Sequence, residues 1–332
     1  MELKDERYKS IRLSFEPSAH KYTDNRGYEY ISTTTILHKY VPKFDEKYWL
    51  RKKSKDLGIT EKKLKEQWDK IKNEACERGS DRHDGLEKGI KGSSQFINAI
   101  QYLYRDGNEM ITVADIPTTI GNYKLLNIEE FKSITNNKYP QINSVFEKYA
   151  NIGYKIYAEI GTFLIDYLVS GTIDVLLIRD DGFIIGDWKT NRDGLKFESG
   201  YYKKDTTVKP HQLTDIWIPK REMLLPPVAN LPNCNGSTYN LQLSMYAYNL
   251  ETILGIPCRG MWLCHIDCDF ELNQYGQPKR FEDGLYHIKD NPVEKTTFYV
   301  MPYRKKEIEL ILNERLIQLK SINIDNQLNL NL

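Results

Sequence analysis

The chain has 332 residues, of which 40% are hydrophobic and 28% charged, and its net charge is +1 at pH 7. These values allow a sizeable core and exclude a polycation that binds nucleic acid through its overall charge. No run of about 18 apolar residues occurs, and the N-terminus MELKDERYKS lacks an apolar stretch, so we predict neither a membrane span nor a signal peptide. We therefore expect a cytosolic protein, in its own cell or in a host.

The N-terminal 60 residues predict a β-hairpin followed by helix, which we treat as an elaboration of the main domain. Residues 11–35 alternate apolar and polar side chains around the turn residues Asp24 to Gly27. Ser32 and the three threonines after it precede Ile36 and Leu37, which is typical of a helix N-cap. These hydroxyls could also receive a phosphate, but capping is the default interpretation.

Residues 48–72 have a local excess of positive charge, with nine Lys and Arg against four Asp and Glu. A lysine-rich helical face is usually solvated, but here it leads into a helix predicted from Glu61 to about Ile90. That helix places Gly79, His83 and Glu87 on one face at i, i+4 spacing. His83 could bind a metal as a neutral imidazole or serve a structural role.

The stretch Gly171–Asn191 predicts two apolar strands joined by a turn at Asp180, Asp181 and Gly182. In such a pair Asp174 of the first strand and Asp187 and Lys189 of the second share one face. Unpaired charges in a buried hairpin cost several kcal/mol each, so the cluster must be paired or must hold an ion. Two carboxylates suit Mg²⁺, with Lys189 placed to orient a water; a structural salt bridge to Lys189 is the alternative.

The segment 192–238 is longer than ordinary connections and rich in Pro, Gly, Asn and aromatic residues. We predict a loop without secondary structure, of the kind that forms lids or binding sites. Its residues Tyr201 to Lys204 suit stacking and phosphate contact with a single strand, or anchoring of the loop itself.

The C-terminal third predicts a helix from Tyr239 to Ile253, a strand at 260–271, a strand at 296–302 and a helix from Arg304 to about Ser321. Residues 323–332 are expected to fray. Five cysteines do not suggest a disulfide framework. Cys264 shares one face of its strand with Trp262 and Ile266, which indicates ordinary core use.

Four short motifs together resemble the PD-(D/E)XK nuclease superfamily, in its RecB-like exonuclease branch as found in phages. In chain order they are Arg78-Gly79 with His83, Gly171-x-Ile173-Asp174, Asp187-x-Lys189-Thr190, and Gln242 with Tyr246. Each motif is weak, but their order over residues 78–246 makes the resemblance specific. It implies an α/β fold with a restriction-endonuclease-like core, a mixed central sheet flanked by helices, over residues 61–322.

The resemblance also implies site residues and partners. It implies Mg²⁺ or Mn²⁺ held by His83, Asp174, Asp187 and the carbonyl of Trp188; catalysis by Asp174, Asp187, Lys189 and an accessory Glu159; and substrate contacts from Gln242, Tyr246, Arg78 and Thr190. DNA is the implied partner, with a single-strand annealing or replication protein as a further candidate and no membrane. A phage protein of this kind would act in the host cytoplasm.

Several alternatives stay open. The same core could serve an endonuclease or junction resolvase, an RNA-directed nuclease, or a catalytically idle DNA-binding or virion-associated protein. Some relatives bind an iron–sulfur cluster through one upstream and three downstream cysteines. In those nucleases the downstream cysteines begin with a C-x₂-C pair. Here five residues separate Cys258 from Cys264 and three separate Cys264 from Cys268, so we do not expect a cluster.

Overall fold

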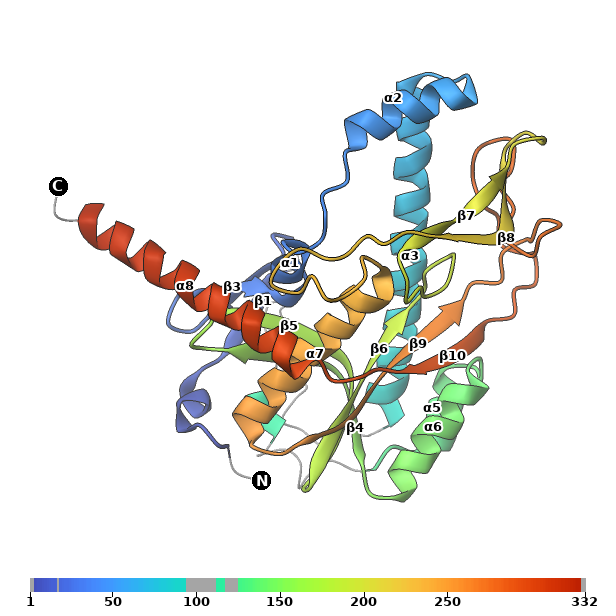
Figure 1. The fold of residues 1–332 in the computed structure, drawn as a ribbon. Coiled ribbons are helices and arrows are strands. Elements are labelled where there is room, and N and C mark those ends of the chain that lie inside the picture. The colour runs from blue at the N-terminus through green and yellow to red at the C-terminus, as the bar shows by residue number, and fades with distance from the viewer. Residues whose placement is uncertain (1–2, 17, 94–111, 117–124, 330–332) are drawn as a thin grey trace.

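The computed structural model describes residues 3–16, 18–93, 112–116 and 125–329. Its centre is a mixed eight-stranded sheet with helices on both faces, which confirms the predicted α/β class (Figure 1). None of the helices in these ranges combines the length and the apolar character that a membrane crossing needs.

The N-terminal region forms the predicted hairpin. A short 3-10 helix at Glu6–Ser10 precedes β1 (Leu13–Glu16), β2 (Lys21–Asp24) and β3 (Glu29–Ser32). Strands β2 and β3 pair antiparallel, and Gly27 in their turn has a left-handed backbone with φ of 88°. Ser32 caps α1 (Thr33–His38), because its hydroxyl accepts a hydrogen bond from the Thr35 amide at 3.1 Å.

The sheet has the order β1-β2-β3-β5-β6-β9-β10, with β4 paired to β5 outside this path. Strands β3 and β5, and β6 and β9, are parallel, and the remaining pairs are antiparallel. The central hairpin is the one predicted, since β5 ends at Arg179 and β6 starts at Gly182. The strands not yet given are β4 (Lys155–Leu164), β5 (Val169–Arg179), β6 (Gly182–Lys189), β9 (Cys258–Asp267) and β10 (Lys295–Val300).

The central strands are buried on both faces, which explains their nearly continuous apolar sequence. Along β6, Phe183 and Ile185 pack into one cluster with Leu243 of α7 (Asn235–Leu254). Ile184 and Trp188 face the opposite way, into a second cluster. That cluster holds residues from α3 (Glu61–Ser93), α5 (Ile128–Ile134) and α6 (Pro140–Asn151). Cys264 lies there with Trp262 and Ile266, as its strand pattern predicted.

Two helical elaborations extend from this core (Figure 1). Helix α2 (Glu46–Leu57) ends at Gly58, whose left-handed φ of 67° turns the chain into the long helix α3. Helix α8 (Lys305–Asn329) continues past its predicted end, so the described part of the expected frayed tail belongs to this helix. A second short 3-10 helix occurs at Val113–Asp115.

The segment 192–238 contains a hairpin where we predicted a loop without secondary structure. Strands β7 (Gly200–Asp205) and β8 (Gln212–Pro219) pair antiparallel as a separate two-stranded sheet. The Gln212 side-chain amide exchanges two hydrogen bonds with the backbone of Arg280, at 2.6 and 2.9 Å. The prediction failed because residues of β7 alternate between exposed and half-buried, so no strand-like apolar pattern marks them.

Candidate metal centre

The centre lies where the β5–β6 ladder stops. The last pair is Val175 with Gly186, and the register places Asp174 and Asp187 next to one another just beyond it. There the Asp174 carboxylate replaces a backbone partner, because its Oδ2 accepts the hydrogen bond of the Trp188 amide at 3.0 Å. Two carboxylates therefore meet at the point where the strands part, as the hairpin pattern predicted.

Glu159 adds a third carboxylate from the neighbouring strand. The pairs Ala158 with Val175 and Ile160 with Ile173 place Glu159 opposite Asp174. Its backbone is left-handed, with φ of 54°, which is uncommon for a residue other than glycine and is often found at functional sites. Burial raises the pKa of Glu159 well above its ordinary value, and the charge of Asp174 raises it further. The three carboxylates thus repel one another in this structure.

His83 reaches the same point from α3. Its Nε2 lies 3.2 Å from the carbonyl oxygen of Trp188, and its Nδ1 lies 3.4 Å from Oδ2 of Asp174. Gly79, one turn earlier, lies against Thr190, where a Cβ would make an ordinary contact at 3.4 Å from Oγ1. Burial lowers the pKa of His83, which favours the neutral imidazole that binds metals.

The contact of His83 Nε2 with the Trp188 carbonyl favours one tautomer of the ring. A carbonyl can only accept, so Nε2 carries the proton toward Trp188 and leaves Nδ1 as a bare lone pair. That lone pair faces the Asp174 carboxylate, and two acceptors at this distance repel unless a proton or a cation lies between them. The Trp188 carbonyl, predicted as a metal ligand, therefore has a further contact in orienting the imidazole.

Three of these side chains could hold a metal ion. His83, Glu159 and Asp174 each offer one ligand atom, and the three atoms lie within 4.8 Å of one another. Ligands of an octahedral Mg²⁺ lie at about 2.0–2.1 Å from the ion and thus at most about 4.2 Å apart, so only small side-chain movements are needed. The set of one imidazole and two carboxylates fits a divalent cation. Asp187, predicted as a ligand, lies beside this group and outside it.

Asp187 instead pairs with Lys189. The Asp187 side chain is 2% exposed, and Lys189 Nζ lies 2.7 Å from its Oδ1. In the described part of the chain, neither oxygen of Asp187 has a partner of good hydrogen-bond geometry. Burial and the charge of Asp174 raise the pKa of Asp187 to about 7, against the opposing effect of Lys189. Burial opposes the charge of Lys189, but Asp187 and Asp174 raise its pKa overall.

An aromatic ring that sequence reasoning missed also holds Lys189. Its Nζ lies 4.4 Å from the ring centroid of Tyr239, on the first turns of α7, which is a cation–π contact. The Tyr239 hydroxyl accepts a hydrogen bond from the Asn191 side chain at 3.0 Å. No local pattern in the sequence could indicate this contact, since the two residues are far apart along the chain.

The predicted substrate residues are placed in three different ways. Gln242 donates a hydrogen bond to the hydroxyl of Tyr246 at 3.2 Å, and the buried Tyr246 ring packs on Gly171, where a Cβ would lie only 2.6 Å from it. This contact accounts for the glycine of the motif. Thr190 is half-buried beside Gly79. Arg78 turns toward Phe270, with its guanidinium 5.2 Å from the ring, and is not brought to the carboxylates by any contact of the described residues.

The five cysteines are all free in the structure. Cys264 and Cys268 are buried and Cys76 is exposed. Burial raises the pKa of the Cys264 thiol, as expected for an inert core side chain.

A comparison with known proteins found no protein-family model, curated protein or solved structure that matches the chain.

Proposed function

We propose that the protein is a divalent-metal-dependent nuclease that hydrolyses phosphodiester bonds in DNA, with exonucleolytic cleavage as the expected mode. The observation that carries the proposal is the convergence of His83, Glu159 and Asp174 from three elements, beside the buried pair of Asp187 and Lys189. The resemblance to RecB-like PD-(D/E)XK nucleases led us to expect His83 and Asp174 at such a site, but with Asp187 as a further ligand and Glu159 only as an accessory. A salt bridge alone explains it poorly, because Lys189 pairs with Asp187 and the pKa of Glu159 stays raised against the opposing charge of Lys91.

A bound Mg²⁺ or Mn²⁺ would supply Lewis-acid activation of the phosphodiester and of the attacking water. His83, Glu159 and Asp174 would hold it, and the Nε2 contact of His83 with Trp188 keeps the imidazole in the binding tautomer. The fit rests on donor chemistry: a bare Nδ1 faces a carboxylate, and the acid beside it has a raised pKa.

Lys189 is the residue we assign to the reacting phosphate. Asp187 at 2.7 Å and the Tyr239 ring at 4.4 Å fix its ammonium group, which leaves it little freedom to rearrange during the reaction. A fixed positive charge of this kind stabilises negative charge that develops on phosphoryl oxygens and can position the attacking water. Asp187 is then a positioning residue, since it acts by holding Lys189.

The proposal is tested by digestion of end-labelled DNA. The protein is incubated with single- and double-stranded linear DNA and with covalently closed circles, in Mg²⁺, in Mn²⁺ or in EDTA. We expect cleavage of linear DNA that requires the cation, with closed circles left intact. Cleavage of the circles would assign an endonuclease. A folded protein that binds Mn²⁺ weakly or not at all by calorimetry and cleaves none of these substrates would refute the proposal.

A further inference from the structure

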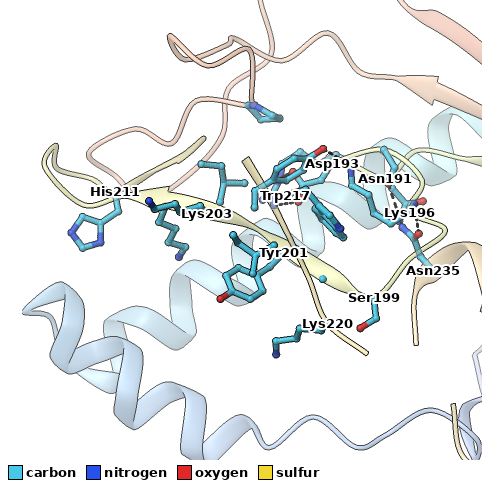
Figure 2. A pocket seen from close by; sticks show the side chains of 18 of the residues that line it. Asn191, Asp193, Lys196, Ser199, Tyr201, Lys203, His211, Trp217, Lys220 and Asn235 are labelled. Atoms are coloured by element: carbon cyan, nitrogen blue, oxygen red, sulfur yellow. Dashed lines mark hydrogen bonds and ion pairs between the residues drawn. The ribbon is translucent and has the colours of Figure 1, made fainter. Parts of the chain in front are cut away.

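A groove formed mainly by the inserted segment reaches Asn191, close in sequence to Lys189 of the candidate centre. Its volume is about 1200 Å³, and it lies between the β7–β8 hairpin, the side chains Trp49, Lys52 and Lys53 of α2, and residues 278–286. It begins at Asn191, two residues beyond Lys189. Figure 2 shows Lys203, Tyr201 and Lys220 along the hairpin and Asn191, Asp193 and Lys196 gathered at the other end.

The lining of the groove is strongly cationic although the chain as a whole is not. Eight lysine and arginine side chains line it, against Asp193 and Glu222 as its only acids among the described residues. Both acids already have partners, because Asp193 pairs with Arg192 at 2.5 Å and Glu222 with Lys220 at 3.0 Å. The basic residues are Lys52, Lys53, Arg192, Lys196, Lys203, Lys204, Lys220 and Arg280.

Lys204 lines the groove together with Lys53 and Arg280. Burial lowers its pKa, and the neighbouring charges of Lys53 and Arg280 lower it further. Asp56 acts in the opposite direction but lies 3.8 Å from Lys53 as that residue's own ion-pair partner. Like charges that line one groove repel one another, and an anion bound among them offsets this repulsion. Lys53, Lys204 and Arg280 come from three separate segments of the chain and line the same groove.

Aromatic rings are interleaved with these charges. Tyr201 is 51% exposed, with the Lys220 ammonium 5.6 Å from its ring centroid. Tyr202 and Trp217 form an edge-to-face pair with centroids 5.1 Å apart, and Lys196 contacts both rings. Exposed rings within a basic groove bind nucleic acid by stacking on bases, and only an unpaired strand presents its base faces.

We propose that this groove holds an unpaired nucleic-acid strand, with a phosphate at Lys53, Lys204 and Arg280 and a base stacked on Tyr201, and leads it to the metal centre. The inference deepens the proposed nuclease function and rests on it. The connection is direct, because Asn191 lines the groove and hydrogen-bonds Tyr239, whose ring lies against Lys189. A deoxyribose or a ribose strand would satisfy these contacts equally.

Binding is measured without cleavage, by fluorescence anisotropy of labelled oligothymidine in EDTA between about 50 and 200 mM salt. Lys204→Gln removes one phosphate contact, so the slope of log K against log salt should become less steep by about 0.7. Lys306→Gln is the matched control, since Lys306 is exposed on α8 and does not line the groove. Its slope should equal that of the native protein.

Stacking is tested at Tyr201. Tyr201→Ala should weaken binding of the oligothymidine by about 5- to 150-fold, and Tyr201→Phe, which keeps the ring, by less than about twofold. The affinity for a blunt duplex of the same length should change by less than about twofold in either variant, because a duplex presents no free base face to Tyr201. An oligouridine arm identifies the strand, because tighter binding of it than of oligothymidine assigns the groove to RNA.

Two outcomes would overturn the inference: native-level binding in both Lys204→Gln and Tyr201→Ala, or a duplex that binds more tightly than the single strand and loses as much affinity in Tyr201→Ala. These results are distinct from a failure of the nuclease proposal. If both groove variants weaken binding but the native protein cleaves nothing in Mn²⁺, the nuclease proposal fails and the groove inference stands. If the protein cleaves DNA and both variants bind the single strand like the native protein, the groove inference fails and the nuclease proposal stands.

Discussion

Asp24 and Asp187 are both buried carboxylates, at 5% and 1% exposure, but their surroundings differ in kind. Asp24, the last residue of β2, accepts hydrogen bonds from the Arg26 guanidinium, the Tyr30 hydroxyl and two backbone amides. Burial opposes its charge, but Arg26 and Tyr30 lower its pKa overall. Asp187 has one lysine, a neighbouring carboxylate and a pKa raised to about 7. A carboxylate that serves the fold is saturated with donors, whereas one in a functional centre is left short of them.

The largest effect is expected from a substitution at the candidate metal centre. Asp174→Asn removes a candidate metal ligand, so cleavage of linear DNA should fall by about 10³-fold. Asp24→Asn is the matched control, because it makes the same chemical change in the saturated site and should leave cleavage near the native rate. Initial rates on end-labelled DNA in Mg²⁺ measure both. Comparable losses in the two variants would mean that Asp174 acts only through the fold.

Lys189→Met separates a catalytic lysine from a structural one. If Lys189 only neutralises the carboxylates, its loss should destabilise the protein by about 3–5 kcal/mol. If a bound cation neutralises them, the variant should fold nearly normally in Mg²⁺ while cleavage falls by about 10²-fold. DNA affinity should change little. Melting temperature, anisotropy and digestion on this one variant distinguish the cases, and native-level cleavage by a well-folded variant would refute the role of Lys189.

Metal binding should raise stability only where carboxylates lack donors. At about 100 times its Kd, Mn²⁺ should stabilise the native protein by about 2.7 kcal/mol, a rise in Tm of about 4 °C. The rise should vanish in Asp174→Asn and persist in Asp24→Asn. Thermal unfolding followed by circular dichroism measures it. An equal rise in native protein and Asp174→Asn would place the bound ion elsewhere.

The smallest expected effect belongs to the saturated carboxylate. Asp24→Asn weakens charge-assisted hydrogen bonds to Arg26 and Tyr30 and should cost about 1.5–3 kcal/mol of unfolding free energy. The loss should be the same in Mn²⁺ and in EDTA, because no cation is involved. Urea denaturation in the two buffers gives both values. A loss that depends on Mn²⁺ would contradict the contrast between the two sites.

The sequence predicted the site best where the apolar pattern of the strands and the position of the charged residues pointed to the same strand register. The apolar strands around Asp180–Gly182 could bury their side chains in only one register, and that register placed Asp174 beside Asp187. The grouping of Glu159 with His83 needed more, since it depends on how β4 pairs with β5 and how α3 crosses the sheet. Contacts between distant segments leave no local pattern, which is why Glu159 was expected only as an accessory.

The groove illustrates the opposite case. Strand β7 has no buried face, so its Tyr-Tyr-Lys-Lys sequence shows no apolar alternation, although its composition did suggest contact with a strand. The backbone of Arg280 is held to β8 by two hydrogen bonds with the Gln212 side chain, and Arg280 comes from the segment between the predicted strands at 260–271 and 296–302. The charge excess of residues 48–72 was visible, but only the fold brings Lys53 beside Lys204.

Helix α3 connects the groove to the candidate metal centre. Gln67 near its start donates a hydrogen bond to the Asp283 carbonyl at 2.9 Å, beside the Arg280 wall of the groove, and His83 on the same helix touches the centre. These residues are sixteen positions apart, so the helix spans about 24 Å between them. A continuous helix resists shortening, and a strand gripped at the groove would therefore meet the metal at a set distance. Under the proposed function, helix geometry would then set the length of strand between the groove and the cleaved bond.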